Sequence, residues 1–311
     1  REKMEIAIQF ILLALGFVML AKGADWFVEG AAGIAMRFGI PQLVIGLTIV
    51  AMGTSAPEAA VSIAAAVKGN ADITIGNIVG SNILNILVIL GLAASIVPIA
   101  VARSTVRIEI PFMIGVTALL FYQGRDGSIS LADGGVLMVA FAVYMMYLYT
   151  MAMKSNVDSD LEEPGLPLGR CLLGAVGGLA LIIAGSNVTV GAATSIATYA
   201  GLSERFIGLT IVALGTSLPE LFTSLAAARR GNADIAIGNI VGSNIFNILF
   251  VVGLSSLIID IPFASAFNFD TYVALGAAVL LWLCVLRTQR LQRWAGALML
   301  VCYAAYLGYI L

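Results

Sequence analysis

The sequence predicts an all-α polytopic membrane protein of ten transmembrane helices, arranged as two inverted-topology repeats of five helices each. Three observations predict it. Of the 311 residues, 60% are hydrophobic and only 11% are charged, whereas soluble domains carry about 25% charged residues. Apolar segments of about 20 residues recur along the whole chain. One long stretch of sequence also occurs twice.

The apolar segments place the expected spans in order. The first stays apolar to about Ala35 with no cleavage-like break, so we interpret it as a spanning helix and not as a signal peptide. A polar connection at 155–167, SNVDSDLEEPGLP, is typical of a loop. It is expected to link a first five-helix repeat (1–154) to a second (168–311). The expected spans are 5–35, 41–67, 71–97, 105–122, 133–154, 168–199, 205–229, 233–259, 270–287 and 291–310.

The duplication relates the two halves. Residues 41–90 align with 203–252 at a constant offset of 162, with 33 identities in 50 positions and no gaps. Because five is an odd number of spans, the second half must enter the membrane in the opposite orientation. This is the plan of many secondary transporters, whose substrates bind near the bilayer midplane where the halves meet.

Loop charges predict the orientation. Cytoplasmic loops of membrane proteins carry an excess of Lys and Arg. With both termini outside, the inner side holds ten basic residues and the outer side five. We therefore expect the 155–167 loop to be cytoplasmic. The inner set is Arg37, Arg103, Arg107, Lys154, Arg170, Arg229, Arg230, Arg287, Arg290 and Arg293, and the outer set is Arg1, Lys3, Lys68, Arg125 and Arg205.

The motif GTSAPE at 53–58 is expected to break the second span. Pro57 has no amide hydrogen for the carbonyl of Gly53, and glycine is a poor helix former. Broken backbone within a bilayer survives only where it lines a cavity or is buried in protein. The carbonyl of Ala51 is then a candidate cation ligand, and Thr54 or Ser55 is expected to cap the next half-helix.

Glu58 falls in the first turn of that half-helix, where the helix dipole favours an ionised carboxylate. The second half repeats the arrangement with GTSLPE at 215–220, which supplies Thr216, Ser217 and Glu220, and with Ala213 as the carbonyl donor. Two carboxylates, hydroxyls and loose backbone near mid-membrane are the ligand chemistry of calcium and sodium.

A second motif, GNIVGSNILN at 76–85, follows in each half. Asn77, Ser81 and Asn85 recur every four residues and so share one helical face. Gly76 and Gly80 form a GxxxG surface, which we interpret as packing. The same roles fall in the second half to Asn239, Ser243, Asn247, Gly238 and Gly242.

Other residue types narrow the chemistry. The chain has no histidine, and Cys171, Cys284 and Cys302 lack the spacing of a zinc site. Any cation site must therefore consist of oxygen atoms, and no bound cofactor is expected. A net charge of −2 without a large basic region gives no sign of nucleic-acid binding.

Three charged residues of the first span leave alternatives open. Lys22 is a candidate partner for Glu58, but the position that matches Lys22 in the second half is Ala184, so such a pair explains one glutamate and not both. A buried charge costs at least about 2.5 kcal/mol on insertion scales, which favours a functional role for the two glutamates. Asp25 and Glu29 either line the mouth of the site or are solvated or paired with Lys22.

With these motifs in view, the sequence resembles the cation/calcium exchanger superfamily, in particular its prokaryotic sodium/calcium exchanger branch. The paired GTSxPE and GNxxGSNxxN motifs are signatures of that family, and both occur twice here. The resemblance implies alternating access, in which the long first and sixth spans slide past a more fixed core.

The resemblance also implies the roles of individual residues. It implies that Glu58 and Glu220 bridge a central calcium site, helped by Thr54, Thr216 and the carbonyls of Ala51 and Ala213. It implies that Ser55, Ser217, Ser81 and Ser243 contribute to flanking sodium sites and that Asn85 and Asn247 lie at the centre. Family members can carry aspartate at one of these last two positions, whereas both are asparagine here.

The function expected is antiport of Ca2+ against Na+ in the cell (inner) membrane by a chain that acts as a monomer within the lipid bilayer. A H+/Ca2+ antiporter that uses the same glutamates is the alternative, and a cation channel is a more distant one. An enzyme such as an intramembrane hydrolase is disfavoured because there is no histidine and no evident pair of nucleophile and base.

Overall fold

The computed structural model describes residues 2–69, 71–155, 166–201 and 213–310. Within these ranges, eight helices are long and apolar enough to cross a membrane, and a ninth span is obtained if the bent pair Gln42–Thr54 and Ala56–Val67 is counted as one. The chain is therefore an all-helical, multi-pass membrane protein. The seventh expected span, 205–229, falls partly on residues 202–212, outside the described part.

The helices follow the expected spans, with ends that differ by a few residues. Those of the first half are α1 (Glu2–Phe38), α2 (Gln42–Ile45), η1 (Gly46–Val50), α3 (Ala51–Thr54), α4 (Ala56–Val67), α5 (Asp72–Leu84), η2 (Asn85–Leu90), α6 (Gly91–Ile96), η3 (Thr105–Glu109), α7 (Ile110–Gln123), η4 (Gly124–Asp126) and α8 (Leu131–Ser155). Those of the second half are α9 (Leu168–Tyr199), α11 (Ala213–Thr216), α12 (Leu218–Arg229), α13 (Ala233–Phe246), η6 (Asn247–Val252), α14 (Gly253–Ile258), α15 (Phe267–Leu286) and α16 (Arg293–Ile310).

Equivalent helices of the two halves end in the same way. Gly69 and Gly231, which are 162 residues apart, follow α4 and α12 with φ of 77° and 79°. Glycine adopts this left-handed conformation without the steric cost of a Cβ, and it is the residue that most often ends a helix. The GN pair after each broken helix therefore marks its end.

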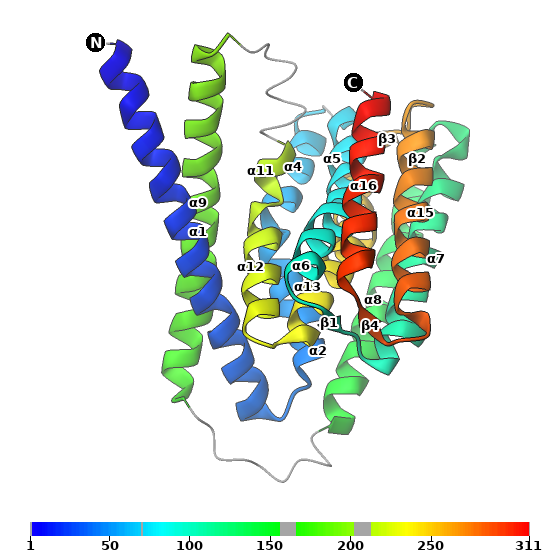
Figure 1. Ribbon diagram of the computed structural model, residues 1–311. Helices are drawn as coiled ribbons and strands as arrows, with labels where there is room; N and C mark the ends of the chain where they lie inside the picture. Colours follow the sequence, from blue (N-terminus) through cyan, green and yellow to red (C-terminus); the bar gives the residue numbers. More distant parts are fainter. Residues whose placement is uncertain (1, 70, 156–165, 202–212, 311) are drawn as a thin grey trace.

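Two short strand pairs join loops from different halves. β1 (Ile99–Ala100) pairs antiparallel with β4 (Arg290–Leu291), and β2 (Ser128–Ile129) pairs with β3 (Ile261–Pro262). The two pairs lie at opposite ends of the helices (Figure 1). The loops that follow α6 and α14 match in the sequence repeat, yet they lie at these opposite ends. The start of α1 and the end of α16 lie at the end that carries β2 and β3 (Figure 1).

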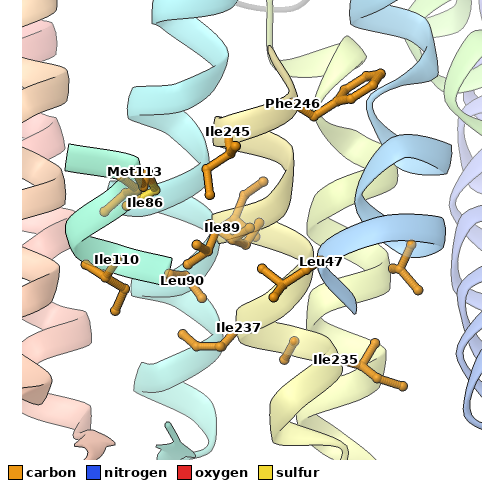
Figure 2. Close-up of a cluster of buried hydrophobic side chains, with 14 of the residues drawn as sticks. Leu47, Ile86, Ile89, Leu90, Ile110, Met113, Ile235, Ile237, Ile245 and Phe246 are labelled. Carbon is orange, nitrogen blue, oxygen red and sulfur yellow. The ribbon is translucent and has the colours of Figure 1, made fainter. Parts of the chain in front are cut away.

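The most buried helices surround the centre of the protein. Of the most apolar part of the span Ala233–Ile258, 94% is buried, against 17% for Ile6–Phe38. Leucine, isoleucine, methionine and phenylalanine side chains from η1, η2, α7 and α13 fill the space between these helices (Figure 2). The exposed apolar surface of α1, such as Phe10 and Ile11, is that of a helix in contact with lipid.

Helices α1 and α9 lie against each other along their length, beside the other helices (Figure 1). Their contact is made by backbone atoms, because glycines recur every seven residues at Gly16, Gly23 and Gly30. A Cβ on Gly30 would lie 2.4 Å from the amide nitrogen of Ala175, and one on Gly23 would lie 2.9 Å from the carbonyl oxygen of Gly178. Small residues of this kind allow two membrane helices to approach closely. We call this contact the glycine seam.

The glycine seam predicts the effect of one added methyl group. Gly30→Ala should separate α1 from α9 and lower the free energy of unfolding by about 1–3 kcal/mol, the usual cost of overpacking. Thermal unfolding of the purified protein in detergent measures the change. Gly177→Ala on α9 is the matched control, because a Cβ there meets nothing within 4 Å. Equal unfolding temperatures for the two variants would contradict the backbone contact.

Candidate cation site

A one-residue break in each half brings a glutamate to the start of a half-helix. α3 ends at Thr54 and α4 begins at Ala56, and the helix pair is bent by 51°. α11 ends at Thr216 and α12 begins at Leu218. Pro57 and Pro219 lie in the first turns, where a missing amide hydrogen costs nothing. Glu58 and Glu220 therefore lie in the first turns of α4 and α12, where the helix dipole stabilises negative charge.

The two glutamates are each held by a serine of the other half. Ser55 Oγ donates a hydrogen bond to Glu220 Oε1 at 2.8 Å, and Ser217 Oγ donates one to Glu58 Oε1 at 3.3 Å. The expectation that Thr54 or Ser55 caps α4 is wrong: Ser55 lies at the N-cap position, but its hydroxyl makes no capping bond. It bonds the opposite carboxylate instead. The reciprocal bonds join the halves at one point.

Both carboxylates are buried and keep one oxygen without a partner. Each glutamate is 1% exposed, and Glu58 Oε2 and Glu220 Oε2 have no hydrogen-bond partner among the described residues. The two side chains also lie close enough for their negative charges to repel each other. Burying charge without a counter-charge is strongly unfavourable. A cation between the two carboxylates would remove both costs.

Asparagines of the second motif hold the first turns in place. Asn77 Nδ2 donates to the Glu58 carbonyl oxygen at 3.3 Å and to Ser62 Oγ at 2.9 Å. Asn239 Nδ2 makes the equivalent bonds to the Glu220 carbonyl at 3.4 Å and to Ser224 Oγ at 2.9 Å. These amide donors therefore hold the first turns that carry the two glutamates.

A ladder of four amides connects α5 with α13. Asn82 Nδ2 donates to the Asn244 carbonyl and Asn244 Nδ2 to the Asn82 carbonyl, both at 3.1 Å. Asn85 Nδ2 donates to Asn244 Oδ1 at 2.9 Å, and Asn247 Nδ2 donates to Asn82 Oδ1 at 3.1 Å. We call these four residues the amide ladder. Its outer members, Asn85 and Asn247, keep their Oδ1 atoms buried and without a partner among the described residues.

The sequence reasoning missed Asn82 and Asn244. They do not share the four-residue spacing of Asn77, Ser81 and Asn85, so they were not predicted to lie on the polar face of the helix. The signal that identifies them is the exact repetition of GSN at 80–82 and 242–244. An asparagine within a membrane span is costly unless its amide is bonded, so each of the two is expected to have a hydrogen-bond partner, although the repeat does not say which.

The carbonyl of Ala51 is not free, contrary to the expectation from the break. It accepts bonds from the Ser55 amide at 3.0 Å, from Thr54 Oγ1 at 3.3 Å and from Ser243 Oγ at 3.3 Å. The α-helical bond to Ser55 persists because the chain bends after this residue. Thr54 Oγ1 also bonds Asn239 Oδ1 at 3.0 Å. These hydroxyls satisfy Ala51 in the present arrangement.

The structure brings most of the expected residues around the two carboxylates. The side chains of Thr54, Ser55 and Ser243 lie close to Glu220, and those of Thr216 and Ser217 lie close to Glu58. The remaining members are placed individually. Ser81 is buried on α5, and Ala213 is the first residue of α11.

The arrangement offers oxygen ligands to a hard cation. Among the buried oxygens without a partner in the described part of the chain, four belong to the glutamates and the amide ladder: Glu58 Oε2, Glu220 Oε2, Asn85 Oδ1 and Asn247 Oδ1. Calcium takes six to eight oxygens, often with hydroxyl and carbonyl atoms among them. In the described part of the chain, no three His, Cys, Asp or Glu side chains gather as a transition metal would need. The chemistry therefore suits calcium or sodium.

The charged residues of α1 lie away from these carboxylates. Arg230, just after α12, pairs with Asp25 at 3.4 Å and with Glu29 at 3.2 Å, and all three side chains are partly exposed. Lys22, the alternative partner, is exposed on α1. Asp25 and Glu29 thus tie α1 to the end of α12.

Known proteins resemble this chain over nearly its whole length. A family model described as sodium/calcium exchanger protein matches residues 8–150 and 171–311. CaxA of Alkalimonas amylolytica, described as a candidate antiporter, is 40% identical over 95% of this chain and 96% of its own. The sodium/calcium exchanger MaX1 of Methanosarcina acetivorans is 32% identical over 97% and 98%. A solved structure of the sodium-calcium exchanger NCX_Mj superposes with a TM-score of 0.85, at 34% identity, over 97% of this chain and 99% of that one.

The amide ladder predicts a loss of stability on truncation. Asn244→Ala should lower the free energy of unfolding by about 1–3 kcal/mol, because it leaves the buried side-chain amide of Asn85 without its acceptor and removes one of the bonds to the Asn82 carbonyl. Asn82→Ala should have the same effect by symmetry. Thermal unfolding in detergent measures both. Asn187→Ala is the control, since Asn187 is exposed on α9; a ladder variant as stable as this control would show that the bonds contribute nothing.

Proposed function

The chain belongs to the sodium/calcium exchanger protein family, and we propose that it is a secondary-active antiporter that exchanges Ca2+ for Na+ by alternating access. It is a transporter and not an enzyme. The observation that carries the proposal is the pair of buried glutamates, one from each half, each held by the serine of the other half and each with one oxygen unpartnered.

Charge balance explains why the same site would take two kinds of ion. Two ionised carboxylates balance one Ca2+, whereas several Na+ ions leave surplus positive charge. Occupancy by each ion class therefore favours a different state of the protein. Two buried carboxylates without a bound cation are energetically costly, whichever side of the membrane the site faces. The site must therefore carry either Ca2+ or Na+ when it changes sides, and this requirement couples the transport of the two ions.

We assign the ligands on the geometry and on the family resemblance together. Glu58 and Glu220 bridge Ca2+ in this proposal, with Thr54, Thr216 and the carbonyls of Ala51 and Ala213. Binding at the Ala51 carbonyl requires the hydroxyls of Thr54 and Ser243 to turn from it toward the ion. The residues assigned to the sodium sites are Ser55, Ser217, Ser81 and Ser243, with Asn85 and Asn247 at the centre.

The proposed architecture is ten spans in two inverted repeats, 1–154 and 168–311, joined by a loop at 155–167. Two facts support it. Loops that match in the sequence repeat lie at opposite ends of the helices, where they join β1 to β4 and β2 to β3. The family model matches two segments that leave out residues 151–170.

We propose the cell (inner) membrane as the location, with both termini outside and a single chain as the functional unit. A relative from Escherichia coli strain K12 named inner membrane protein YrbG is 40% identical over 79% of this chain. The loop charges support the orientation, since the basic residues concentrate on the side of the 155–167 loop.

The alternative counter-ion is the proton. Two protons also neutralise two carboxylates, and the protonated glutamates would still accept hydrogen bonds from Ser55 and Ser217. Because residues 85 and 247 are both asparagine, Glu58 and Glu220 are the only charged candidate ligands in the two duplicated motifs. This bears on the number and kind of monovalent ions that accompany each Ca2+.

Removing either carboxylate charge tests the site. Glu58→Gln and Glu220→Gln keep the shape and a hydrogen-bond acceptor but leave one charge to face Ca2+. We expect 45Ca2+ uptake into proteoliposomes, driven by an outward Na+ gradient, to fall to background in both. Glu29→Gln, an exposed glutamate of α1, is the matched control and should retain uptake. Retained transport in both site variants would refute the assignment.

The driving ion is tested by comparing gradients. We expect an outward Na+ gradient to drive 45Ca2+ uptake at equal pH, because neutral hydroxyls and amides beside the glutamates suit Na+. A pH gradient at equal Na+ should not drive it. Uptake driven by pH alone would establish the H+/Ca2+ alternative, and a flux that persists without any counter-ion gradient would indicate a channel.

A further inference from the structure

A third buried carboxylate lies outside the exchange site. Glu109, the last residue of η3 at the start of α7, is fully buried. The hydroxyl of Tyr147, on α8, donates a hydrogen bond to its Oε1. Its other oxygen, Oε2, is buried and has no hydrogen-bond partner among the described residues. The mechanism proposed above makes no use of this group.

Two more hydroxyls are close to the same carboxylate. Thr105, four residues before Glu109 on one helical face, lies near it, as does Tyr144 of α8. The Tyr144 ring is fixed by stacking on Phe112 with ring centroids 5.4 Å apart. Thr105 Oγ1 and the Tyr144 hydroxyl are buried and, within the described part of the chain, unpartnered. Three unsatisfied oxygens thus gather in one place, which is unusual unless something binds them.

No fixed positive charge among the described residues balances Glu109. Arg107, two residues away on the same helix, is exposed, and so is Lys154, the basic residue of α8. From α15, the side chain that reaches η3 is Trp282, whose indole N–H donates to the Val106 carbonyl at 2.9 Å. A lone buried carboxylate needs one positive charge, which three neutral hydroxyls do not supply.

The remaining ionisable groups on the neighbouring helices face other partners. On α15, Asp270 accepts a bond from Tyr306, Tyr272 packs on Phe121, and Cys284 lies beside Cys302. On α13 and η6, Asp234 is the only charged residue. It lies where α13 approaches Gly46 of the broken helix. Tyr144 and Tyr147 are therefore the titratable groups that face Glu109.

A purely structural tether between the helices does not require this arrangement. The second half also joins its last two helices through a tyrosine and a carboxylate, Tyr306 and Asp270 at 2.8 Å, but Asp270 is partly exposed. The position that matches Glu109 is Thr271, whose hydroxyl bonds the Phe267 carbonyl of its own helix at 2.7 Å. Two helices can thus be joined without a fully buried carboxylate, so joining α7 to α8 does not explain the unpartnered oxygen of Glu109.

The helix geometry at Glu109 sets it apart as well. Thr105–Glu109 is π-helical, a conformation that is rare and concentrates at functional sites. The other π-helical segments in the described part of the chain begin at Asn85, begin at Asn247, or end directly before Ala51. Each of those adjoins a residue of the candidate cation site, whereas η3 adjoins Glu109.

We propose that Glu109, Thr105, Tyr144 and Tyr147 form a second binding site, separate from the exchange site, for one monovalent cation, either a proton or Na+. A single positive charge matches the single carboxylate, whereas a divalent ion would leave an unbalanced buried charge. A bound proton satisfies Glu109 Oε2 as a neutral acid. A bound Na+ takes its ligands from the carboxylate and the three hydroxyls.

Infrared difference spectroscopy of the purified full-length protein tests the site and separates the two occupants. Spectra are recorded in Na+-free buffer and after addition of Na+, with K+ as the ionic-strength control. To remove signals of the exchange site, the measurement is repeated with Glu58→Gln and Glu220→Gln combined. A carboxylic-acid carbonyl band that is lost in Glu109→Gln identifies a bound proton. Replacement of that band by carboxylate bands on addition of Na+, but not of K+, identifies Na+.

A second variant keeps the test decisive if Glu109→Gln does not fold. Tyr147→Phe removes the phenol that bonds Glu109 Oε1, and it should move the Glu109 band to higher frequency because the carbonyl is less strongly hydrogen-bonded. Thr271→Val, at the matching position of the second half, should leave the band unchanged. The proposal is overturned if Glu109 is ionised in Na+-free buffer and none of its bands responds to Na+.

Discussion

The structure depends on the placement of two negative charges in a region that excludes water. A carboxylate in the bilayer interior is tolerated only with compensating contacts, and the surrounding elements each supply one. The half-helix dipoles point their positive ends at Glu58 and Glu220, Ser55 and Ser217 bond them from the opposite half, and Asn77 and Asn239 hold their backbone. These contacts leave one oxygen on each glutamate without a partner among the described residues, which is why we propose that a cation completes the centre.

Two kinds of helix contact divide the molecule. The core around the glutamates is joined by directional bonds: the amide ladder ties α5 to α13 through main-chain and side-chain oxygens, so that a shift of either helix breaks several bonds together. The glycine seam between α1 and α9 is different, because Gly23 and Gly30 bring the two backbones into close contact. The seam therefore holds α1 and α9 together as a pair that lies beside the core. Polar contacts between this pair and the core include the exposed pairing of Arg230 with Asp25 and Glu29 and a bond from Ser186 Oγ to the Gly215 carbonyl at 2.7 Å.

The two halves make the same contacts around the glutamates of the candidate cation site, but they differ in their last two helices. The same serine, glutamate and asparagine contacts recur in both halves, as expected if one ion is met from two sides as we propose. The last two helices of each half have no such requirement, and there Glu109 faces Tyr147 while the matching Thr271 bonds its own backbone. The buried carboxylate of Glu109 therefore occurs in the first half only and has no counterpart in the second.

The sequence by itself determined the helical membrane class, the breaks before Glu58 and Glu220, and the oxygen chemistry of the site. Hydropathy, proline and duplicated polar motifs act locally, so they can be recognised along the chain. Only the tertiary structure decided the partners. That Ser55 bonds Glu220 and does not cap its own helix, that the Ala51 carbonyl is satisfied by Ser243, and that Asn82 faces Asn244 all depend on how the two halves meet. Contacts between residues 162 to 192 positions apart are set by helix packing, which no local pattern encodes.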